Sequence, residues 1–167
     1  MSDFKTNLND NRFAEEAAHG LDGVIDKTDP EHCKHLYGLV VQYEDIDAGG
    51  IVYHSTYLNF AERARSALLR ASKFDVQYWL AEENQGFVIT HIETDYLSPA
   101  KLHNRLIVET ICLQLGGASA LLQQNINSFD RGHIFARVMV KAAWVDLEFG
   151  PRKFPEPLQM VLRSFQP

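Results

Sequence analysis

One long amphipathic segment constrains the fold of this chain more than any other feature. From residue 52 to about residue 72, apolar side chains recur at helical spacing, and charged side chains lie largely elsewhere on the circumference. The apolar positions are Tyr57, Phe60, Ala61, Ala64, Leu68 and Ala71. This spacing predicts a single long helix whose apolar stripe must be buried against another element.

The other apolar segments are typical of strands rather than helices. They are rich in β-favouring residues and occupy residues 35–43, 87–96, 105–115, 118–129 and 133–146. A second, shorter helix is predicted at residues 76–83. The later strands are separated by the turn residues Ser98-Pro99, Gly116-Gly117 and Asp130-Arg131-Gly132, and such short links favour antiparallel neighbours. The pattern predicts an α+β fold with an antiparallel sheet of about five strands wrapped around one long central helix.

The two ends of the chain are expected to lie outside this sheet. Residues 1–34 are predicted to form a weakly structured N-terminal extension, since Gly20, Gly23 and Pro30 interrupt it, and docking of the extension on a partner is an alternative. Residues 35–167 are then one domain. Prolines recur at positions 151, 155 and 157, which predicts an ordered edge followed by a short tail.

Composition excludes several classes of function. The 167 residues include 16 basic and 22 acidic side chains, and the net charge of -6 argues against a broad surface for nucleic acid or anionic membrane. Cys33 and Cys112 lie far apart, and the seven histidines have no metal-binding spacing, so neither a disulfide nor a metal site is predicted. No apolar run is long enough for a membrane span or an export signal, so we expect a cytoplasmic protein.

The run from Tyr43 to His54 carries the chemistry. It places Asp45, Asp47, Gly49 and Gly50 where the first strand hands over to the long helix. Glycine allows another molecule to approach the main chain closely, and the first turn of a helix exposes unpaired N–H donors. An acid beside such a turn can attack a polarised carbonyl or activate water toward it, although such a turn can also be plain punctuation.

These residues resemble a known family. The run Tyr43 to His54 and the following Glu62-Arg63-Ala64-Arg65 are similar to the hallmark of the YbgC branch of the 4-hydroxybenzoyl-CoA thioesterase family, which has the hotdog fold. The resemblance continues through residues 87–89, 95–100 and 145–152 and covers about residues 36–160. It is interrupted at Ser66-Ala67-Leu68, and the first 34 residues have no counterpart in the shorter members.

The resemblance implies an acyl-CoA thioesterase in which Asp47 is the nucleophile or the general base and Asp45 is not catalytic. A thioester needs no triad, because its thiolate leaves readily. Backbone N–H groups at the helix start, chiefly that of His54, are expected to hold the carbonyl oxygen, and Gly49 and Gly50 to permit the close approach. The alternatives are that an aspartate here only caps backbone donors and that the His54 side chain itself contacts substrate.

Substrate and partners are expected from the same resemblance. The substrate is a thioester of coenzyme A or of acyl carrier protein, with no cofactor beyond the coenzyme A of the substrate. Tyr53 is a candidate substrate-binding residue, although it can also be a core or subunit contact. Hotdog domains pair into dimers or tetramers with the site at the subunit boundary, so a homotetramer is an expectation. The alternative function is a binding module for acyl carrier protein or the Tol-Pal envelope system, with incidental hydrolysis. A third, a hotdog dehydratase, fits the Asp-x-Asp-x-Gly-Gly context poorly.

Overall fold

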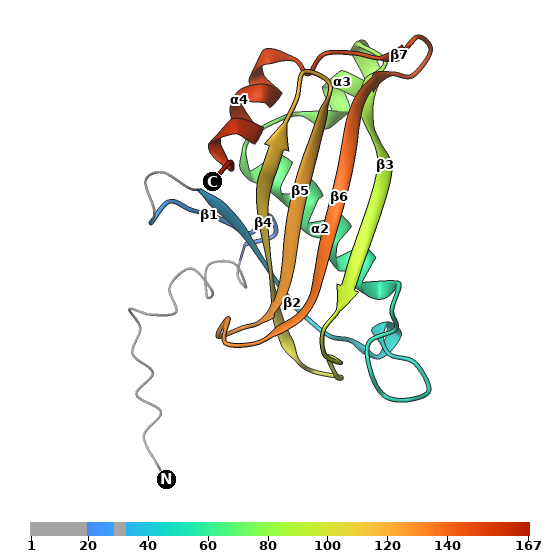
Figure 1. The fold of residues 1–167 in the computed structure, drawn as a ribbon, viewed down its shortest axis with the longest axis vertical. Helices are drawn as coiled ribbons and strands as arrows, with labels where there is room; N and C mark the ends of the chain where they lie inside the picture. The colour runs from blue at the N-terminus through green and yellow to red at the C-terminus, as the bar shows by residue number, and fades with distance from the viewer. Residues whose placement is uncertain (1–19, 29–32) are drawn as a thin grey trace.

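The computed structural model describes residues 20–28 and 33–167. Its sheet is antiparallel throughout, in the spatial order β1-β2-β4-β5-β6-β3, with β7 pairing β6 (Figure 1). The strands are β1 (Val24–Asp26), β2 (Lys34–Val40), β3 (Gln85–Tyr96), β4 (Arg105–Leu115), β5 (Ser119–Ser128), β6 (Ile134–Asp146) and β7 (Gly150–Pro151). The helices are η1 (Tyr43–Asp45), α2 (Thr56–Ala71), α3 (Val76–Glu82) and α4 (Glu156–Ser164). None of the helices in these ranges is both long and apolar enough to cross a membrane.

Helix α2 lies across one face of the sheet, as the apolar stripe predicts (Figure 1). Its buried side chains are Thr56, Tyr57, Phe60, Ala61, Ala64, Ala67 and Leu68. Phe60 and the three alanines are fully buried, and alanine at three positions lets the helix backbone approach the strands closely. The helix begins at Thr56 rather than at the predicted residue 52, because Val52 forms a β-bridge with Ile46. The α+β hotdog architecture with a central helix is confirmed.

The five long strands occupy the predicted segments, but one predicted pairing is wrong. The links at Gly116-Gly117 and at residues 130–132 do join antiparallel neighbours, β4 to β5 and β5 to β6. The link that contains Ser98-Pro99 does not, since β3 pairs with β6 and β4 pairs with β2 and β5. The connection from β3 to β4 reaches the end of β2, where Val41 N–H donates to the Asn104 carbonyl at 2.9 Å. Among the described strands β3 pairs with β6 alone and lies at the edge of the sheet.

The C-terminal residues form a helix, although the prolines there had led us to predict none. We predicted an ordered edge and then a short tail; the edge is present as β7, but the tail is helix α4. Pro155 is the N-cap and Pro157 lies in the first turn, where a missing N–H leaves no bond unmade. Leu158, Leu162 and Phe165 are buried against a cluster that includes Trp144 and covers one end of the sheet.

Part of the predicted N-terminal extension is a strand. Residues 24–26 form β1 and pair with β2, and the Asp22 carboxylate accepts a hydrogen bond from Arg70 of α2 at 2.6 Å. The rest of the extension, residues 1–19 and 29–32, lies outside the described residues. The predicted domain boundary at residue 34 stays a prediction.

The packing of α4 predicts the cost of truncating one side chain. Leu158 is 0% exposed, so Leu158→Ala should lower the free energy of unfolding by about 2–5 kcal/mol through lost burial and the cavity left behind. Met160 on the same helix is 66% exposed, and Met160→Ala should change it by less than about 0.5 kcal/mol. Urea unfolding followed by tryptophan fluorescence measures both. Equal effects would show that α4 is not packed on the sheet.

Candidate active site

Asp45 fixes the loop that connects β2 to α2. It is the last residue of η1, is 4% exposed, and its Oδ2 accepts the Gln42 N–H at 2.7 Å. Its carbonyl accepts the Tyr53 N–H at 2.9 Å, which ties the two ends of the loop together. A buried carboxylate that is hydrogen-bonded to backbone in this way holds structure, the role that the cap alternative assigned to aspartate here.

Asp47 lies two residues further on and is exposed. Its N–H donates to the Ile51 carbonyl at 2.9 Å, and its carbonyl accepts the Gly50 N–H at 3.0 Å, so a tight turn forms between them. The side-chain Oδ1 accepts the Gly49 N–H at 2.7 Å. Within the described residues Oδ2 has no hydrogen-bond partner. The turn therefore fixes the orientation of the carboxylate through one of its two oxygens.

The two glycines serve this turn in different ways. Gly50 has φ +74°, a left-handed conformation that residues with a side chain adopt at a cost. At Gly49 a Cβ would lie 3.0 Å from Asp47 Oδ1. Neither glycine is among the residues that line the cavity described next, so their predicted contact with substrate stays a prediction.

A cavity of about 380 Å³ lies beside the turn. It brings together three of the predicted site residues, Asp47, Tyr53 and His54. The remaining wall comes from Ile51, Val52, Tyr57, Tyr96, Leu97, Ser98 and Pro99. The loop after β2, the start of α2 and the end of β3 thus meet at one end of the sheet (Figure 1).

The backbone of His54 is held in place from one side. Tyr96 at the end of β3 donates its hydroxyl to the His54 carbonyl at 3.0 Å. Within the described residues the His54 N–H has no acceptor, whereas the neighbouring Tyr53 N–H is bound by Asp45 and the Thr56 N–H by the Tyr53 carbonyl. A free donor at the start of a helix, reinforced by the helix dipole, is suited to an oxygen that develops negative charge.

Sequence reasoning did not identify the contribution of β3 and of Tyr57. Tyr57 Oη accepts the Ala100 N–H at 3.0 Å, and burial raises the pKa of Tyr57, partly offset by this hydrogen bond. Ser98 is hydrogen-bonded to His133, which fixes the turn after β3. The family-like run of residues 95–100 was the signal for this wall, but only the structure places it opposite Asp47.

The phosphates of coenzyme A would need cationic partners, and three of the arginines that could serve are already paired with carboxylates. Arg65 pairs with Glu62, Arg70 with Asp22, and Arg152 with Asp146 at 3.6 Å. The pair at residues 152–153 follows β7, at the end of the sheet away from the Asp47 loop (Figure 1). Arg152 is therefore poorly placed to contact a ligand in this cavity of the same protomer.

The fold and the site define the class of protein. The chain belongs to the thioesterase-like superfamily, whose family model matches residues 41–165. The superfamily membership confirms the family predicted from the run Tyr43 to His54.

Individual relatives agree with this assignment. The chain is 40% identical over 120 residues to the acyl-CoA thioesterase YbgC of Haemophilus influenzae, covering 71% of this chain and 87% of the relative. Among solved structures, a probable thioesterase from Bartonella henselae matches with a TM-score of 0.68 and 31% identity over 73% of this chain and 99% of the other. A 1,4-dihydroxy-2-naphthoyl-CoA thioesterase from Synechocystis, at 21% identity and TM-score 0.73 over 77% and 95%, shares the fold.

The turn geometry predicts the effect of adding one methyl group. Gly50→Ala should lower the free energy of unfolding by about 1–2 kcal/mol, because alanine disfavours the left-handed conformation. Gly117 is the matched control: it has no positive φ, and a Cβ there meets nothing within 4 Å. Gly117→Ala should leave stability unchanged or raise it by up to about 1 kcal/mol. Thermal or urea unfolding distinguishes the two, and an equal response would contradict the strained turn.

Proposed function

We propose that the protein hydrolyses an acyl-CoA thioester to a free carboxylic acid and coenzyme A. The observation that carries the proposal is the common cavity that Asp47 and His54 line. Among the described residues, neither Oδ2 of Asp47 nor the His54 N–H at the helix start has a hydrogen-bond partner. The thioesterase relatives agree with this chemistry. A thioester is the substrate that needs least help, since sulfur donates weakly into the carbonyl and thiolate is a good leaving group.

Two routes are compatible with one carboxylate. In the first, Asp47 Oδ2 bonds to the carbonyl carbon, the C–S bond breaks, thiolate leaves, and water then hydrolyses the resulting anhydride. In the second, Asp47 takes a proton from water, the hydroxyl bonds to the carbonyl carbon, and the thiolate leaves and is protonated. In both, the His54 N–H stabilises the oxygen on which negative charge develops.

Turnover of a panel of acyl-CoA thioesters tests the proposal. Asp47→Asn keeps the size of the side chain but removes the nucleophile and base, so kcat should fall by about 10²–10⁴-fold. Glu148→Gln is the matched control, because Glu148 is an exposed carboxylate that lies outside the cavity and outside β3, and its kcat should stay near that of the wild type. Undiminished hydrolysis by Asp47→Asn would overturn the assigned role.

The same pair of variants separates hydrolysis from the binding alternative. A protein that serves mainly as a module for acyl carrier protein or the Tol-Pal system should bind its partner equally well with and without Asp47, and should hydrolyse every thioester only marginally.

Transfer of label from isotopically labelled water into the Asp47 carboxyl group would identify the anhydride route, because the water-activating route never bonds that carboxylate to the acyl carbon.

We also propose that the protein is a homo-oligomer paired through β3. This strand is 12 residues long, and its outer edge has no hydrogen-bonded neighbour among the described residues. Val88, Ile89 and Ile92 on it are 41%, 39% and 39% exposed. A long apolar edge strand is a template for uncontrolled pairing unless it is covered, and a second copy of the same strand covers it symmetrically.

Solution mass measurements test this assembly. The wild type should sediment as a dimer or tetramer, and Ile92→Lys should shift it toward the monomer, because a lysine at the paired edge places charge in an apolar contact. Leu147→Lys is the control, since Leu147 is 56% exposed but lies outside β3. A wild type that remains monomeric at all concentrations would contradict the proposal.

A further inference from the structure

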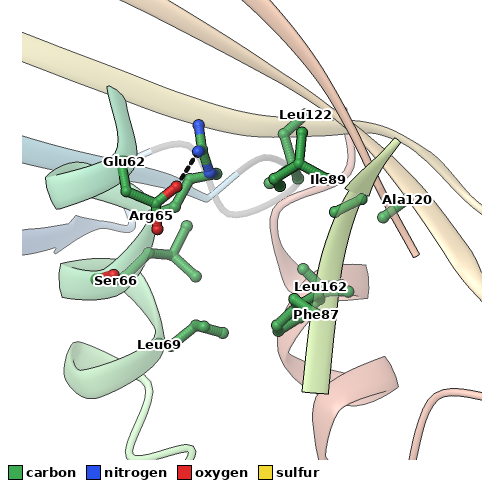
Figure 2. A pocket seen from close by; sticks show the side chains of 11 residues that line it. Glu62, Arg65, Ser66, Leu69, Phe87, Ile89, Ala120, Leu122 and Leu162 are labelled. Atoms are coloured by element: carbon green, nitrogen blue, oxygen red, sulfur yellow. Dashed lines mark hydrogen bonds and ion pairs between the residues drawn. The ribbon is translucent and has the colours of Figure 1, made fainter. Parts of the chain in front are cut away.

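Four of the side chains that line the Asp47 cavity carry a hydroxyl group: Tyr53, Tyr57, Tyr96 and Ser98. A second cavity, beside α2, is different, because its wall consists mainly of apolar side chains from α2, β3, β5, β6 and α4 (Figure 2). A water molecule stays in a cavity only where several polar groups can bind it. The Asp47 cavity is therefore the one suited to hold a water molecule in a defined place.

Ser98 differs from the three tyrosines because its hydroxyl is bonded to an imidazole. Ser98 Oγ is hydrogen-bonded to Nε2 of His133, which directly precedes β6 and does not line the cavity. A neutral imidazole with its proton on Nδ1 accepts through Nε2, whereas the charged ring can only donate. The charge of His133 therefore decides whether Ser98 offers the cavity an acceptor or a donor.

The backbone around Ser98 is held from two sides. The N–H groups of Leu97 and Ser98 both donate to the Phe135 carbonyl, at 2.9 and 3.1 Å. The Ala100 N–H donates to the Tyr57 hydroxyl at 3.0 Å, and Tyr57 is 3% exposed. Because these contacts are with β6 and α2, the hydroxyl of Ser98 is carried by a fixed segment and can hold a reactant in one orientation.

The same segment is bonded to the turn that carries Asp47. The Val52 N–H donates to the Ala100 carbonyl at 2.9 Å, and the Asp47 N–H donates to the Ile51 carbonyl at 2.9 Å. Neighbouring extended segments lie about 4.8 Å apart, so the segments that carry Asp47 and Ser98 are about 10 Å apart. Two side chains and one small molecule span such a distance.

We propose that Ser98 Oγ binds the attacking water together with Asp47, and that His133 is a positioning residue that sets the direction of the Ser98 hydroxyl. The inference rests on the proposed function and selects its second route. When Ser98 donates to His133, its lone pairs accept one O–H of the water while Asp47 accepts the other. Asp47 takes that proton as the water oxygen bonds to the carbonyl carbon; the C–S bond breaks, and the leaving thiolate receives the proton from Asp47.

A proton on His133 reverses this arrangement. The charged ring donates its Nε2–H to Ser98 Oγ, so the Ser98 O–H turns to the cavity and donates to the water oxygen. That bond occupies the lone pair with which the water attacks. Hydrolysis should therefore slow as the pH falls through the range of about pH 8 to 5 in which histidine becomes charged.

The charged groups near His133 are few among the described residues. Residues 97–100, the end of β5 and the start of β6 contain no titratable side chain. Asp130 lies on the same turn as His133; the Ser128 hydroxyl lowers the pKa of Asp130, and the charge of His133 contributes to this shift. Arg131 pairs with a carboxylate of β1 at 3.9 Å. The bond between His133 and Ser98 is thus the route by which this turn acts on the cavity.

The experiment measures kcat against pH with acetyl-, hexanoyl-, benzoyl- and palmitoyl-CoA. Wild-type kcat should fall by about tenfold between pH 8 and pH 5.5, above the range near pH 4 in which carboxylates titrate. His133→Gln should keep kcat at pH 8 within about threefold, because an amide oxygen accepts the Ser98 hydroxyl at every pH, and should lose most of the decline. His103→Gln is the matched control: His103 is exposed and outside the cavity, so the decline should remain.

Ser98→Ala tests the hydroxyl itself. It should lower kcat at pH 8 by about tenfold with little change in KM, since the lost contact is made to the attacking water and not to the bound thioester. Ser164→Ala is the control, because Ser164 is an exposed serine of α4 outside the cavity, and should leave kcat unchanged. The gain in relative activity at pH 5.5 expected of His133→Gln cannot arise from loss of folding.

The outcomes separate this inference from the proposed function. Undiminished kcat in Ser98→Ala, or a decline in His133→Gln equal to that of the wild type, would overturn the inference and leave the proposed function standing. Label from water in the Asp47 carboxyl group would also overturn it, because Asp47 would then be the nucleophile. A wild type that hydrolyses none of the four thioesters would overturn the proposed function and this inference with it.

Discussion

The packing of α2 against the sheet is the contact on which the rest of this structure depends. Fully burying a phenylalanine such as Phe60 stabilises a fold by about 1.5–3 kcal/mol, and the alanines at positions 61, 64 and 67 allow that contact to be close. A helix fixed along its length is fixed at its ends as well. The start of α2 therefore positions the His54 backbone at the cavity that Asp47 also lines. Side chains further along α2 line a second, apolar cavity together with residues of β3, β5, β6 and α4.

The loop before α2 places its two aspartates in different environments. Asp45 is 4% exposed, and its Oδ2 accepts a backbone N–H. Asp47 lines a solvent-open cavity, and among the described residues only its Oδ1 accepts a hydrogen bond. A carboxylate that must react cannot also be fully engaged, since each hydrogen bond to its charged form weakens it as a nucleophile or base. The short Asx-type bond from Gly49 gives Asp47 a defined orientation at the expense of one oxygen only.

Sequence patterns anticipate the parts of this fold that local periodicity determines. The alternation in residues 133–146 and the helical stripe from Tyr57 to Leu68 each reflect one face buried against one neighbour, so single-segment reasoning finds them. Helix α4 was not predicted, because Pro155 and Pro157 were interpreted as helix breakers, although proline is favoured in the first turn of a helix. The edge position of β3 was not predicted, because it depends on the connection by which the chain passes from β3 to a non-neighbouring strand, β4. The cavity wall that contains Tyr96 was not predicted for the same reason. Asp47, Tyr53 and His54 were predicted because a family-like run contains them. The apolar cavity beside α2 could not be predicted in this way, because its residues come from α2, β3, β5, β6 and α4, which no local run connects.

Substrate binding and subunit pairing would be one equilibrium in a pair formed through β3 whose two copies both contact the substrate. A ligand that contacts both copies binds the paired state and not the separated one, so it stabilises the pair by mass action, and pairing in turn raises the affinity for the ligand by the same factor. In the proposed pair, the apolar edge of β3 would supply the part of this coupling that exists without substrate. The same strand contributes to two different sites, since Ile89 lines the apolar cavity beside α2 and the Tyr96 hydroxyl donates to the His54 carbonyl at the other end.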